Sequence, residues 1–299
     1  MKSGKVAVLG RANAGKSTLV NVLVGEKVSI VSPKPQTTRD SIYGVLTTDE
    51  YQIVFEDTPG IYKANSLLNS RMQKTASLSA TDTDVITYLI DGHEGIKQGD
   101  IDEAIKFSSS GVPFILVMTK TDIMPKEKIA EELLKLSVVQ NADDIIAVSA
   151  RKGKNVKKLL DIILEKLSDG EPIFYEDAVT NKSEKFFISE IMREKILLKY
   201  DKEIPHGVAI IVNEFSRGED GIYEIGLDIV CEKANHKAIL IGKGGKALKE
   251  VNKFAREGME KFLGAKVFLT TYVRVGEGWR DRKDLLGEYG YSEAEIGID

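Results

Sequence analysis

A glycine loop near the start of the chain constrains the fold more than any other feature. Residues 10–17 read GRANAGKS, follow the apolar run at 6–9 and open a helical pattern. They fit the phosphate-binding motif G-x-x-x-x-G-K-[ST] in the context that the motif needs, with a strand before it and a helix after it. The glycines let successive backbone N–H groups point at phosphate oxygens, beside a helix N-terminus that favours negative charge. The alternative is a glycine loop that merely turns, and both flanks argue against it.

This loop supplies the predicted contacts to the phosphates of a nucleotide. Lys16 is expected to reach the outer phosphates, and the Ser17 hydroxyl is expected to ligate Mg²⁺. The expected nucleotide-binding residues of the loop are Asn13, Ala14, Gly15, Lys16, Ser17 and Thr18.

The bulk composition limits the classes of protein to consider. A length of 299 residues favours two domains, and a hydrophobic content of 42% is enough for ordinary cores. No segment approaches the roughly 18 unbroken apolar residues of a membrane span, and no secretory signal fits ahead of the strand that begins at Lys5. A single cysteine, Cys231, excludes an internal disulfide. We therefore expect a cytoplasmic protein, and its net charge of −4 argues against indiscriminate nucleic-acid binding by the whole chain.

Strand-like and helical segments alternate over residues 1–168. Strands are expected near 5–9, 41–47, 51–56, 84–90, 112–118 and 145–149, and helices near 15–24, 66–80, 99–109, 125–137 and 154–167. This alternation predicts an α/β P-loop domain with a mostly parallel six-stranded sheet and helices on both faces. Only three residues separate 41–47 from 51–56, too few for a crossover, so these two strands should pair antiparallel at one edge.

The order of elements changes after residue 168. A turn-forming connector at 168–172 precedes a helix near 184–199, strands near 207–216 and 221–231, helices near 234–241 and 245–262, and a strand near 266–275. This grouped order predicts an α+β domain. We divide the chain into a nucleotide-binding domain at 1–170, a linker at 171–182, and a second domain with a C-terminal tail at 183–299.

Three segments beyond the glycine loop extend the predicted nucleotide site. Asp57 and Gly60 stand just past the third strand, where the carboxylate can hold Mg²⁺ through a water and the glycine N–H can sense the γ-phosphate. Their alternative is a plain Pro-Gly turn. At the end of the strand near 112–118, the Asp122 carboxylate can accept both N–H donors on the guanine edge, while the stem of Lys120 covers the ring.

The strand near 145–149 ends in Ser149 and Ala150, where a backbone N–H can meet the guanine carbonyl oxygen. Each of these segments stands at the C-terminal end of its strand, so together they should form one pocket. In order, they resemble the five motifs of the translation-factor-like GTPases: Gly10–Ser17, Thr37-Thr38, Asp57–Gly60, Thr119–Asp122 and Ser149-Ala150.

The resemblance implies binding of GTP and GDP, with Mg²⁺ held by Ser17, Thr38 and, through a water, Asp57. Thr38 of the switch loop at 35–40 is favoured as the magnesium ligand over Thr37, and the alternative is a polar connecting loop. Lys16, Thr38 and Gly60 are the expected catalytic residues.

Three positions qualify that resemblance. Thr119 replaces the usual asparagine of the guanine motif, so its contact with the base and its tie to the phosphate loop should be weaker. Ile61 stands where many GTPases place a water-orienting glutamine, which predicts slow intrinsic hydrolysis. Asn13 looks like the asparagine of potassium-stimulated members, whose side-chain oxygen could ligate K⁺ beside the phosphates; alternatively, it only stabilises the loop.

The second domain carries a glycine loop of its own. Residues 242–245 read GKGG and lie between two predicted helices, as in the G-x-x-G loop with which KH domains clamp a single-stranded backbone. In the α-β-β-α-α-β order, this resembles a type II KH domain. Thirteen basic and five acidic residues lie between positions 233 and 283, a charge excess that attracts phosphate. The expected RNA contacts are Ile241, Gly242, Lys243, Gly244, Gly245 and Lys246.

One GTPase domain followed by one KH domain resembles, over essentially the full length, the Era family of bacterial ribosome-assembly GTPases. The tail at 278–291 supports it. There Trp279 could stack or anchor the C-terminal segment, and we favour the anchor. The resemblance implies binding to 16S ribosomal RNA near its 3′ end, a role in 30S subunit maturation and a monomeric protein. Peripheral contact with the inner membrane is also attributed to the family, although no amphipathic stretch here supports it.

Other classes fit less well. A Der-like GTPase would have two GTPase domains, and this chain has one phosphate loop. A tRNA-modification GTPase remains a related alternative. A small-molecule kinase would need an acceptor site, and a non-enzymatic scaffold would use its second domain to bind protein. Apolar residues such as Ile239, Leu248, Phe254, Phe262 and Leu263 are expected to be ordinary core.

Overall fold

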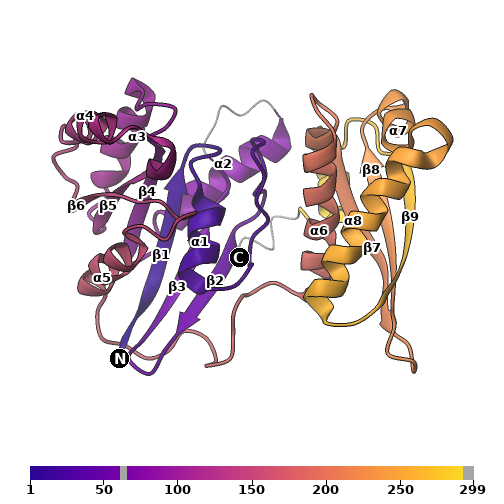
Figure 1. Ribbon diagram of the computed structural model, residues 1–299, viewed down its shortest axis with the longest axis horizontal. Helices are drawn as coiled ribbons and strands as arrows, with labels where there is room; N and C mark the ends of the chain where they lie inside the picture. Colours follow the sequence, from indigo (N-terminus) through magenta and orange to yellow (C-terminus); the bar gives the residue numbers. More distant parts are fainter. Residues whose placement is uncertain (61–65, 292–299) are drawn as a thin grey trace. The chain divides into compact units, whose positions relative to one another are not determined.

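The computed structural model describes residues 1–60 and 66–291. Its described residues form two compact units (Figure 1). The first unit holds 1–60 and 71–181, and the second holds 66–70 and 182–291.

The first unit is built on a six-stranded sheet. Its strands are β1 (Lys2–Gly10), β2 (Ile42–Thr47), β3 (Tyr51–Asp57), β4 (Val85–Asp91), β5 (Phe114–Thr119) and β6 (Asp144–Ala147), in the spatial order β2-β3-β1-β4-β5-β6. Every neighbouring pair is parallel except β2 and β3, which pair antiparallel at one edge. The predicted topology is therefore confirmed, including its antiparallel edge.

Helices cover both faces of this sheet (Figure 1). They are α1 (Lys16–Val24), α2 (Leu67–Ser79), α3 (Gln98–Ser108), α4 (Lys126–Leu136) and α5 (Val156–Lys166). Side chains of a strand point alternately to its two faces. In β1, Val6 and Val8 therefore join the core under α1 and α5, whereas Ala7 and Leu9 join the core under α3 and α4. This two-sided burial explains the continuously apolar central strands.

Part of the predicted linker packs against the first unit. The amide group of Gln52 on β3 holds it: its oxygen accepts the N–H groups of Ile173 and Phe174 at 2.7 and 2.8 Å, and its nitrogen donates to the Phe174 carbonyl. Further along, the Val45 N–H donates to the Val179 carbonyl. Low periodicity marked this stretch as a connector, but its backbone accepts a hydrogen bond from the edge strand β2.

The second unit has the predicted α-β-β-α-α-β order. Its elements are α6 (Glu184–Lys199), β7 (Val208–Arg217), β8 (Tyr223–Cys231), α7 (Ala234–Ile241), α8 (Lys246–Leu263) and β9 (Val267–Val275), followed by the short α9 (Lys283–Glu288). The sheet order is β7-β8-β9, with β7 antiparallel and β9 parallel to β8. Its core lies between the helices and one face of the sheet.

The C-terminal segment is anchored by Trp279, as predicted. Its side chain is fully buried, its indole N–H donates to the Gly207 carbonyl at 3.0 Å, and its ring stacks on Tyr291. Within the same unit, the Leu67 N–H donates to a carboxylate oxygen of Asp281 at 2.9 Å.

Five apolar residues of the second unit, Ile239, Leu248, Phe254, Phe262 and Leu263, were predicted to be core, and the prediction was wrong for three of them. Ile239, Phe254 and Phe262 are 49%, 47% and 42% exposed. Because α8 packs on one side only, it buries the narrow stripe Val251, Ala255 and Met259. Leu248 and Leu263 are partly buried against the same core.

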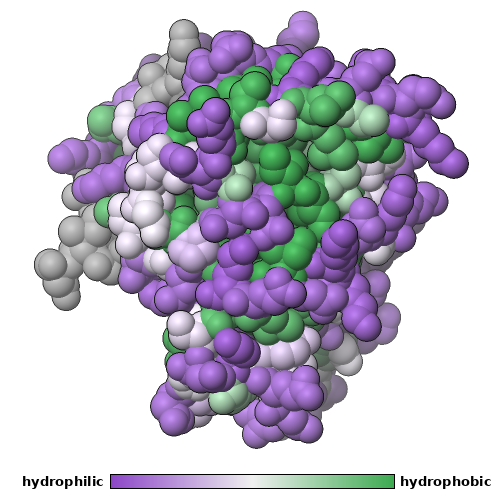
Figure 2. All heavy atoms as spheres, turned by 90° about the vertical axis from the view of Figure 1, so that its left-hand side faces the viewer, coloured by the Kyte–Doolittle hydropathy of each residue, from purple (hydrophilic) through white to green (hydrophobic). Residues whose placement is uncertain are grey.

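Apolar residues also reach the surface of the first unit. Leu134 of α4 and Val138, just beyond that helix, are 72% and 54% exposed. Figure 2 shows hydrophobic side chains gathered between hydrophilic ones on the face that lies to the left in Figure 1. Among the described helices, none combines the length and apolar character needed to cross a membrane.

Candidate nucleotide site and KH loop

The predicted nucleotide residues surround one cavity of about 650 Å³ in the first unit. Its wall includes Asn13, Gly15, Lys16, Ser17, Thr18, Thr38, Gly60, Thr119, Lys120, Asp122 and Ala150. Ala14, Asp57 and Ser149 are buried outside the lining. The strand topology places these residues together, because the C-terminal ends of parallel strands meet at one edge of the sheet.

The backbone of the phosphate loop requires glycine at both ends. Gly10 has φ +139°, and a Cβ there would lie 2.3 Å from the Leu89 carbonyl oxygen. Gly15 has φ +92° and caps α1, so the helix N-terminus opens into the cavity. The loop therefore has the shape and the dipole that suit a phosphate chain.

Lys16 is buried at the base of this loop. Its ammonium group donates to the carbonyls of Gly10 and Arg11, each at 3.0 Å. Burial lowers the pKa of Lys16 to about 8, against the opposing effect of the Asp57 carboxylate. Anionic phosphate oxygens would stabilise the charged form of this side chain.

Three oxygen donors converge beside Lys16. The hydroxyls of Ser17 and Thr38 lie 2.9 Å apart, and the Thr38 hydroxyl donates to Asp57 Oδ2 at 3.4 Å. Burial raises the pKa of the Asp57 carboxyl. Hydrogen bonds to the carboxylate oppose this rise, and the bond with Ser17 has the largest opposing effect. Asp57 Oδ1 is buried with no hydrogen-bond partner among the described residues. Oxygen donors with an orphaned carboxylate oxygen fit Mg²⁺, which prefers such ligands.

The alternative magnesium ligand, Thr37, is engaged elsewhere. Its hydroxyl donates to the Lys34 carbonyl at 2.7 Å. This geometry favours Thr38, which contacts both other donors.

Gly60 lies against the phosphate loop. A Cβ at this position would lie 2.7 Å from the Cα and 2.8 Å from the backbone nitrogen of Ala12. Only glycine permits this approach, which brings the end of the Asp57–Gly60 segment to the cavity wall. Ile61, the predicted cause of slow hydrolysis, lies outside the described residues.

Thr119 connects the guanine motif to the phosphate loop. Its hydroxyl lies 2.7 Å from the Ala14 carbonyl and 3.1 Å from the Ile90 carbonyl, and it can donate its single proton to either. The threonine therefore reaches the phosphate loop, and the weaker tie to that loop stays a prediction. A weaker contact with the base stays a prediction.

The predicted base-recognition residues are oriented by neighbours. Ser149 is fully buried, and its hydroxyl donates to Asp122 Oδ1 at 2.7 Å. The Lys120 ammonium forms an ion pair with Asp91 at 2.5 Å. The carboxylate of Asp122 is thereby held in one orientation at the exposed mouth of the cavity.

Asn13, the predicted K⁺ ligand, has φ +64° and lines the cavity. Its side-chain nitrogen donates to the Pro33 carbonyl at 2.9 Å. Because this bond uses the nitrogen, the side-chain oxygen is the atom that could ligate a cation.

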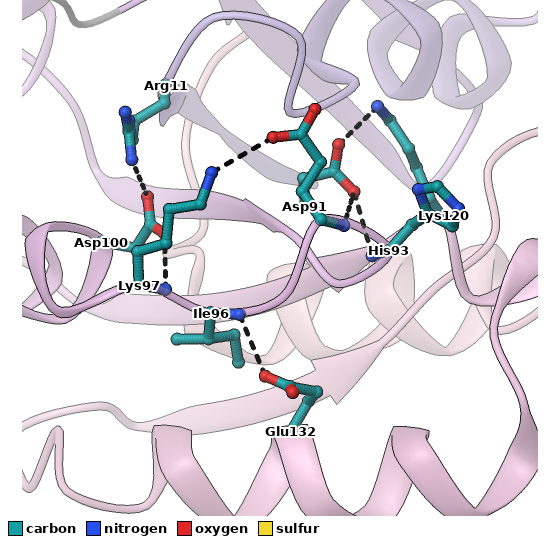
Figure 3. Close-up of polar contacts among 9 residues, drawn as sticks. Arg11, Asp91, His93, Ile96, Lys97, Asp100, Lys120 and Glu132 are labelled. Atoms are coloured by element: carbon teal, nitrogen blue, oxygen red, sulfur yellow. Dashed lines mark hydrogen bonds and ion pairs between the residues drawn. The ribbon is translucent and has the colours of Figure 1, made fainter.

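Sequence reasoning missed two charged residues of the cavity wall, Glu94 and Arg151. Glu94 belongs to the loop between β4 and α3, whose polar contacts Figure 3 shows. A signal existed for both, because each follows the C-terminal end of a sheet strand closely in the sequence.

The KH loop has three glycines with left-handed backbone. Gly242, Gly244 and Gly245 have φ values of +71°, +58° and +74°, and Gly245 caps α8. Ile241 ends α7. Lys243 and Lys246 are exposed on the loop. A basic, glycine-lined turn at a helix N-terminus can accept the backbone phosphates of a single strand.

Comparison with known families agrees with this division. The family described as "50S ribosome-binding GTPase" matches residues 5–120, and the family described as "KH domain" matches residues 203–280. The GTPase Era of Clostridium kluyveri is 44% identical over 291 residues, covering 97% of this chain and 99% of that protein. The GTPase Era of Clostridium botulinum (strain Loch Maree / Type A3) is 43% identical over 290 residues, covering 97% and 98%.

Solved structures are similar over nearly the whole chain. A variant of Aquifex aeolicus Era bound to GDP and AlF4⁻ has a TM-score of 0.93 and 37% identity, covering 98% of this chain and 100% of that one. Era in complex with MgGDPNP and nucleotides 1506–1542 of 16S ribosomal RNA has a TM-score of 0.94 and 37% identity, covering 98% and 99%. A GTPase core and a KH fold at this level of identity over the full length leave one conclusion: the chain belongs to the Era family of GTPases.

Proposed function

We propose that this protein is a GTP-dependent switch that hydrolyses GTP slowly, binds single-stranded 16S ribosomal RNA near its 3′ end and assists 30S subunit maturation. The observation that carries the proposal is that Ser17, Thr38 and the buried Asp57 converge next to Lys16, at the wall of a cavity that also presents Asp122. Phosphate, magnesium and base recognition thus share one site.

The residues of this chain divide the work between binding and chemistry. Lys16 and the N–H groups of residues 13–18 would bind the phosphates and stabilise negative charge as it develops on them. Ser17, Thr38 and, through a water, Asp57 would hold Mg²⁺, which supplies charge neutralisation at the β- and γ-phosphates when bound. Gly60 would offer its N–H to the γ-phosphate from its position against Ala12.

A monovalent cation at Asn13 is part of the proposal. K⁺ beside the phosphates would place positive charge where an arginine finger places it in other GTPases. We expect turnover of the wild type to be faster in potassium than in sodium, and the difference to disappear in Asn13→Ala. Equal rates of the wild type in both salts would reject the cation role.

RNA binding by the KH loop is supported by its glycine geometry and exposed lysines. The crystallised Era homologue holds a fragment of 16S ribosomal RNA, and we extend that ligand class to this chain. Gly244→Asp tests it, because aspartate tolerates left-handed backbone better than most residues and adds negative charge at the loop. No atom lies within 4 Å of a Cβ built there, so the variant should fold.

Gly264→Asp is the matched control. Gly264 has φ +63°, has equally open surroundings, and caps the other end of α8. We expect Gly244→Asp to lower the affinity for a single-stranded ribosomal RNA about tenfold or more, with at most about a twofold loss in the control. Unchanged RNA affinity in Gly244→Asp at moderate salt would favour the alternative of a protein-binding second domain.

The proposal includes coupling between nucleotide and RNA. The support for coupling is the Era homologue that was crystallised with MgGDPNP and a fragment of 16S ribosomal RNA bound together. The domain division at 1–170, 171–182 and 183–299 belongs to the proposal, as do a cytoplasmic, monomeric protein and peripheral contact with the inner membrane.

A further inference from the structure

The loop between β4 and α3, residues 91–97, forms part of the nucleotide cavity. It belongs to none of the five GTPase motifs. Glu94 of this loop lines the cavity together with Lys120 and Asp122. Figure 3 shows that polar contacts connect this loop to the phosphate loop, the guanine motif and α4.

Asp91 lies at the centre of these contacts. Its Oδ1 accepts the backbone N–H groups of His93 and Glu94, at 3.0 and 3.3 Å. Its Oδ2 forms the 2.5 Å ion pair with the Lys120 ammonium. The Asp91 side chain is only 14% exposed, so water screens this pair less than it screens a surface pair. One carboxylate therefore shapes the turn that carries Glu94 and holds Lys120.

The C-terminal end of the loop is fixed independently of Asp91. The Ile96 N–H donates to Glu132 of α4 at 3.0 Å. Asp100 of α3 accepts the Lys97 N–H with one oxygen and pairs with Arg11 through the other, at 3.0 and 3.2 Å. Since these anchors do not involve Asp91, a change at Asp91 should leave this end of the loop in place.

Lysine is a side chain that needs such a restraint. Its four-carbon stem has many rotamers, and holding it in one of them costs conformational entropy. If the restraint is already present before the nucleotide binds, binding does not carry that cost. Lys120 also has a left-handed backbone, with φ +59°, which limits where its stem can start.

We propose that Asp91 is a positioning residue for nucleotide binding, which pre-organises Lys120 as the cover of the purine ring. The inference rests on the proposed function, in which Lys120 contacts the base. Asp91 itself touches neither phosphate nor metal ligand in this account, so its effect should fall on nucleotide affinity rather than on the chemical step.

Asp91→Asn tests this with little other disturbance, because the amide oxygen can still accept the two N–H groups while the charge that holds Lys120 is lost. We expect GDP to dissociate about fivefold faster and the KM for GTP to rise by a similar factor, with at most about a twofold change in kcat. The control is Asp82→Asn, which removes the same charge from the Lys5 ion pair. It should leave GDP dissociation as in the wild type.

Lys120→Met and the double variant decide whether the two residues act as a unit. In the Lys120→Met background, Asp91→Asn should add at most about a further 1.5-fold to the GDP dissociation rate, because the residue that it positions is gone. A full fivefold addition in that background, or an unchanged rate in Asp91→Asn alone, would overturn the inference. An unchanged rate in Lys120→Met would instead contradict the proposed base contact, and the inference with it.

Discussion

The two glycine loops of this chain share a local design but differ in their surroundings. In each, a left-handed glycine caps a helix and a lysine follows as the first helical residue: Gly15-Lys16 at α1 and Gly245-Lys246 at α8. Lys16 is 6% exposed and bonded to two carbonyls, whereas Lys246 is exposed. The same turn thus lines a cavity with a buried lysine in one unit and an exposed surface in the other.

The difference teaches that burial, more than the glycine motif, decides what such a loop can do. A buried lysine with fixed acceptors suits one ligand in one geometry, with strong electrostatic interaction. An exposed lysine beside a glycine turn offers charge that salt screens, which suits a long polyanion of variable path.

The largest expected effect follows from replacing the buried lysine. Lys16→Met should lower GTP turnover about 10³-fold, because it removes the charge that meets the outer phosphates. Lys246→Met removes the exposed counterpart and should leave intrinsic turnover, measured without RNA, within about twofold of the wild type. Comparable losses of phosphate release in the two variants would contradict the contrast.

Burial of Lys16 also makes stability depend on pH. Its pKa is about 8 in the folded protein and 10.5 ordinarily, so the unfolded chain binds more protons in this window. Burying the charged Lys16 therefore lowers the free energy of unfolding of the nucleotide-free protein by roughly 3 kcal/mol below pH 8. This loss of stability decreases as the pH rises from about 8 to 10.5. In denaturant unfolding, the free energy of unfolding of the wild type should rise relative to that of Lys16→Met between pH 7 and pH 10. A constant difference between the two proteins would mean that the lysine is not buried in solution.

A smaller effect is expected from adding a side chain at Gly60, where the backbone packs closely against the phosphate loop. Gly60→Ala places a Cβ against the Ala12 backbone, so the segment must move away from the γ-phosphate. Single-turnover hydrolysis should fall about 100-fold, with GDP binding largely kept. Gly99→Ala on α3 is the control, since nothing lies within 4 Å of its Cβ. Hydrolysis by Gly60→Ala at the wild-type rate would remove Gly60 from the catalytic residues.

The smallest effect concerns the exposed loop. Replacing Lys243 and Lys246 by alanine should reduce the salt slope of RNA affinity by about 1.4, because each lysine that neutralises a phosphate of a single strand contributes about 0.7. Lys261→Ala, at the far end of α8, should leave the slope near that of the wild type. Equal slopes in all three proteins, from titrations at several salt concentrations, would place the RNA elsewhere.

The sequence predicted the chain order of the strands and the antiparallel pair at one edge of the first sheet, since apolar runs and connector lengths leave few topologies open. It also placed most of the cavity wall, because motif residues end strands of one sheet. The position of Glu94 in the cavity wall and the approach of Gly60 to Ala12 depend on how loops from different strands meet. The spacing of residues along the sequence does not predict such loop contacts. Exposure of Phe254 went unpredicted because its helical spacing looks the same whether one or two sides are packed.

If the nucleotide site and the KH loop are coupled, the affinity for RNA must differ between the GDP state and the GTP state of the protein. A single-stranded fragment of the 16S ribosomal RNA 3′ end should be titrated against protein saturated with GDP or with a non-hydrolysable GTP analogue. We expect binding about tenfold tighter in the triphosphate state. Equal dissociation constants in the two states would contradict it.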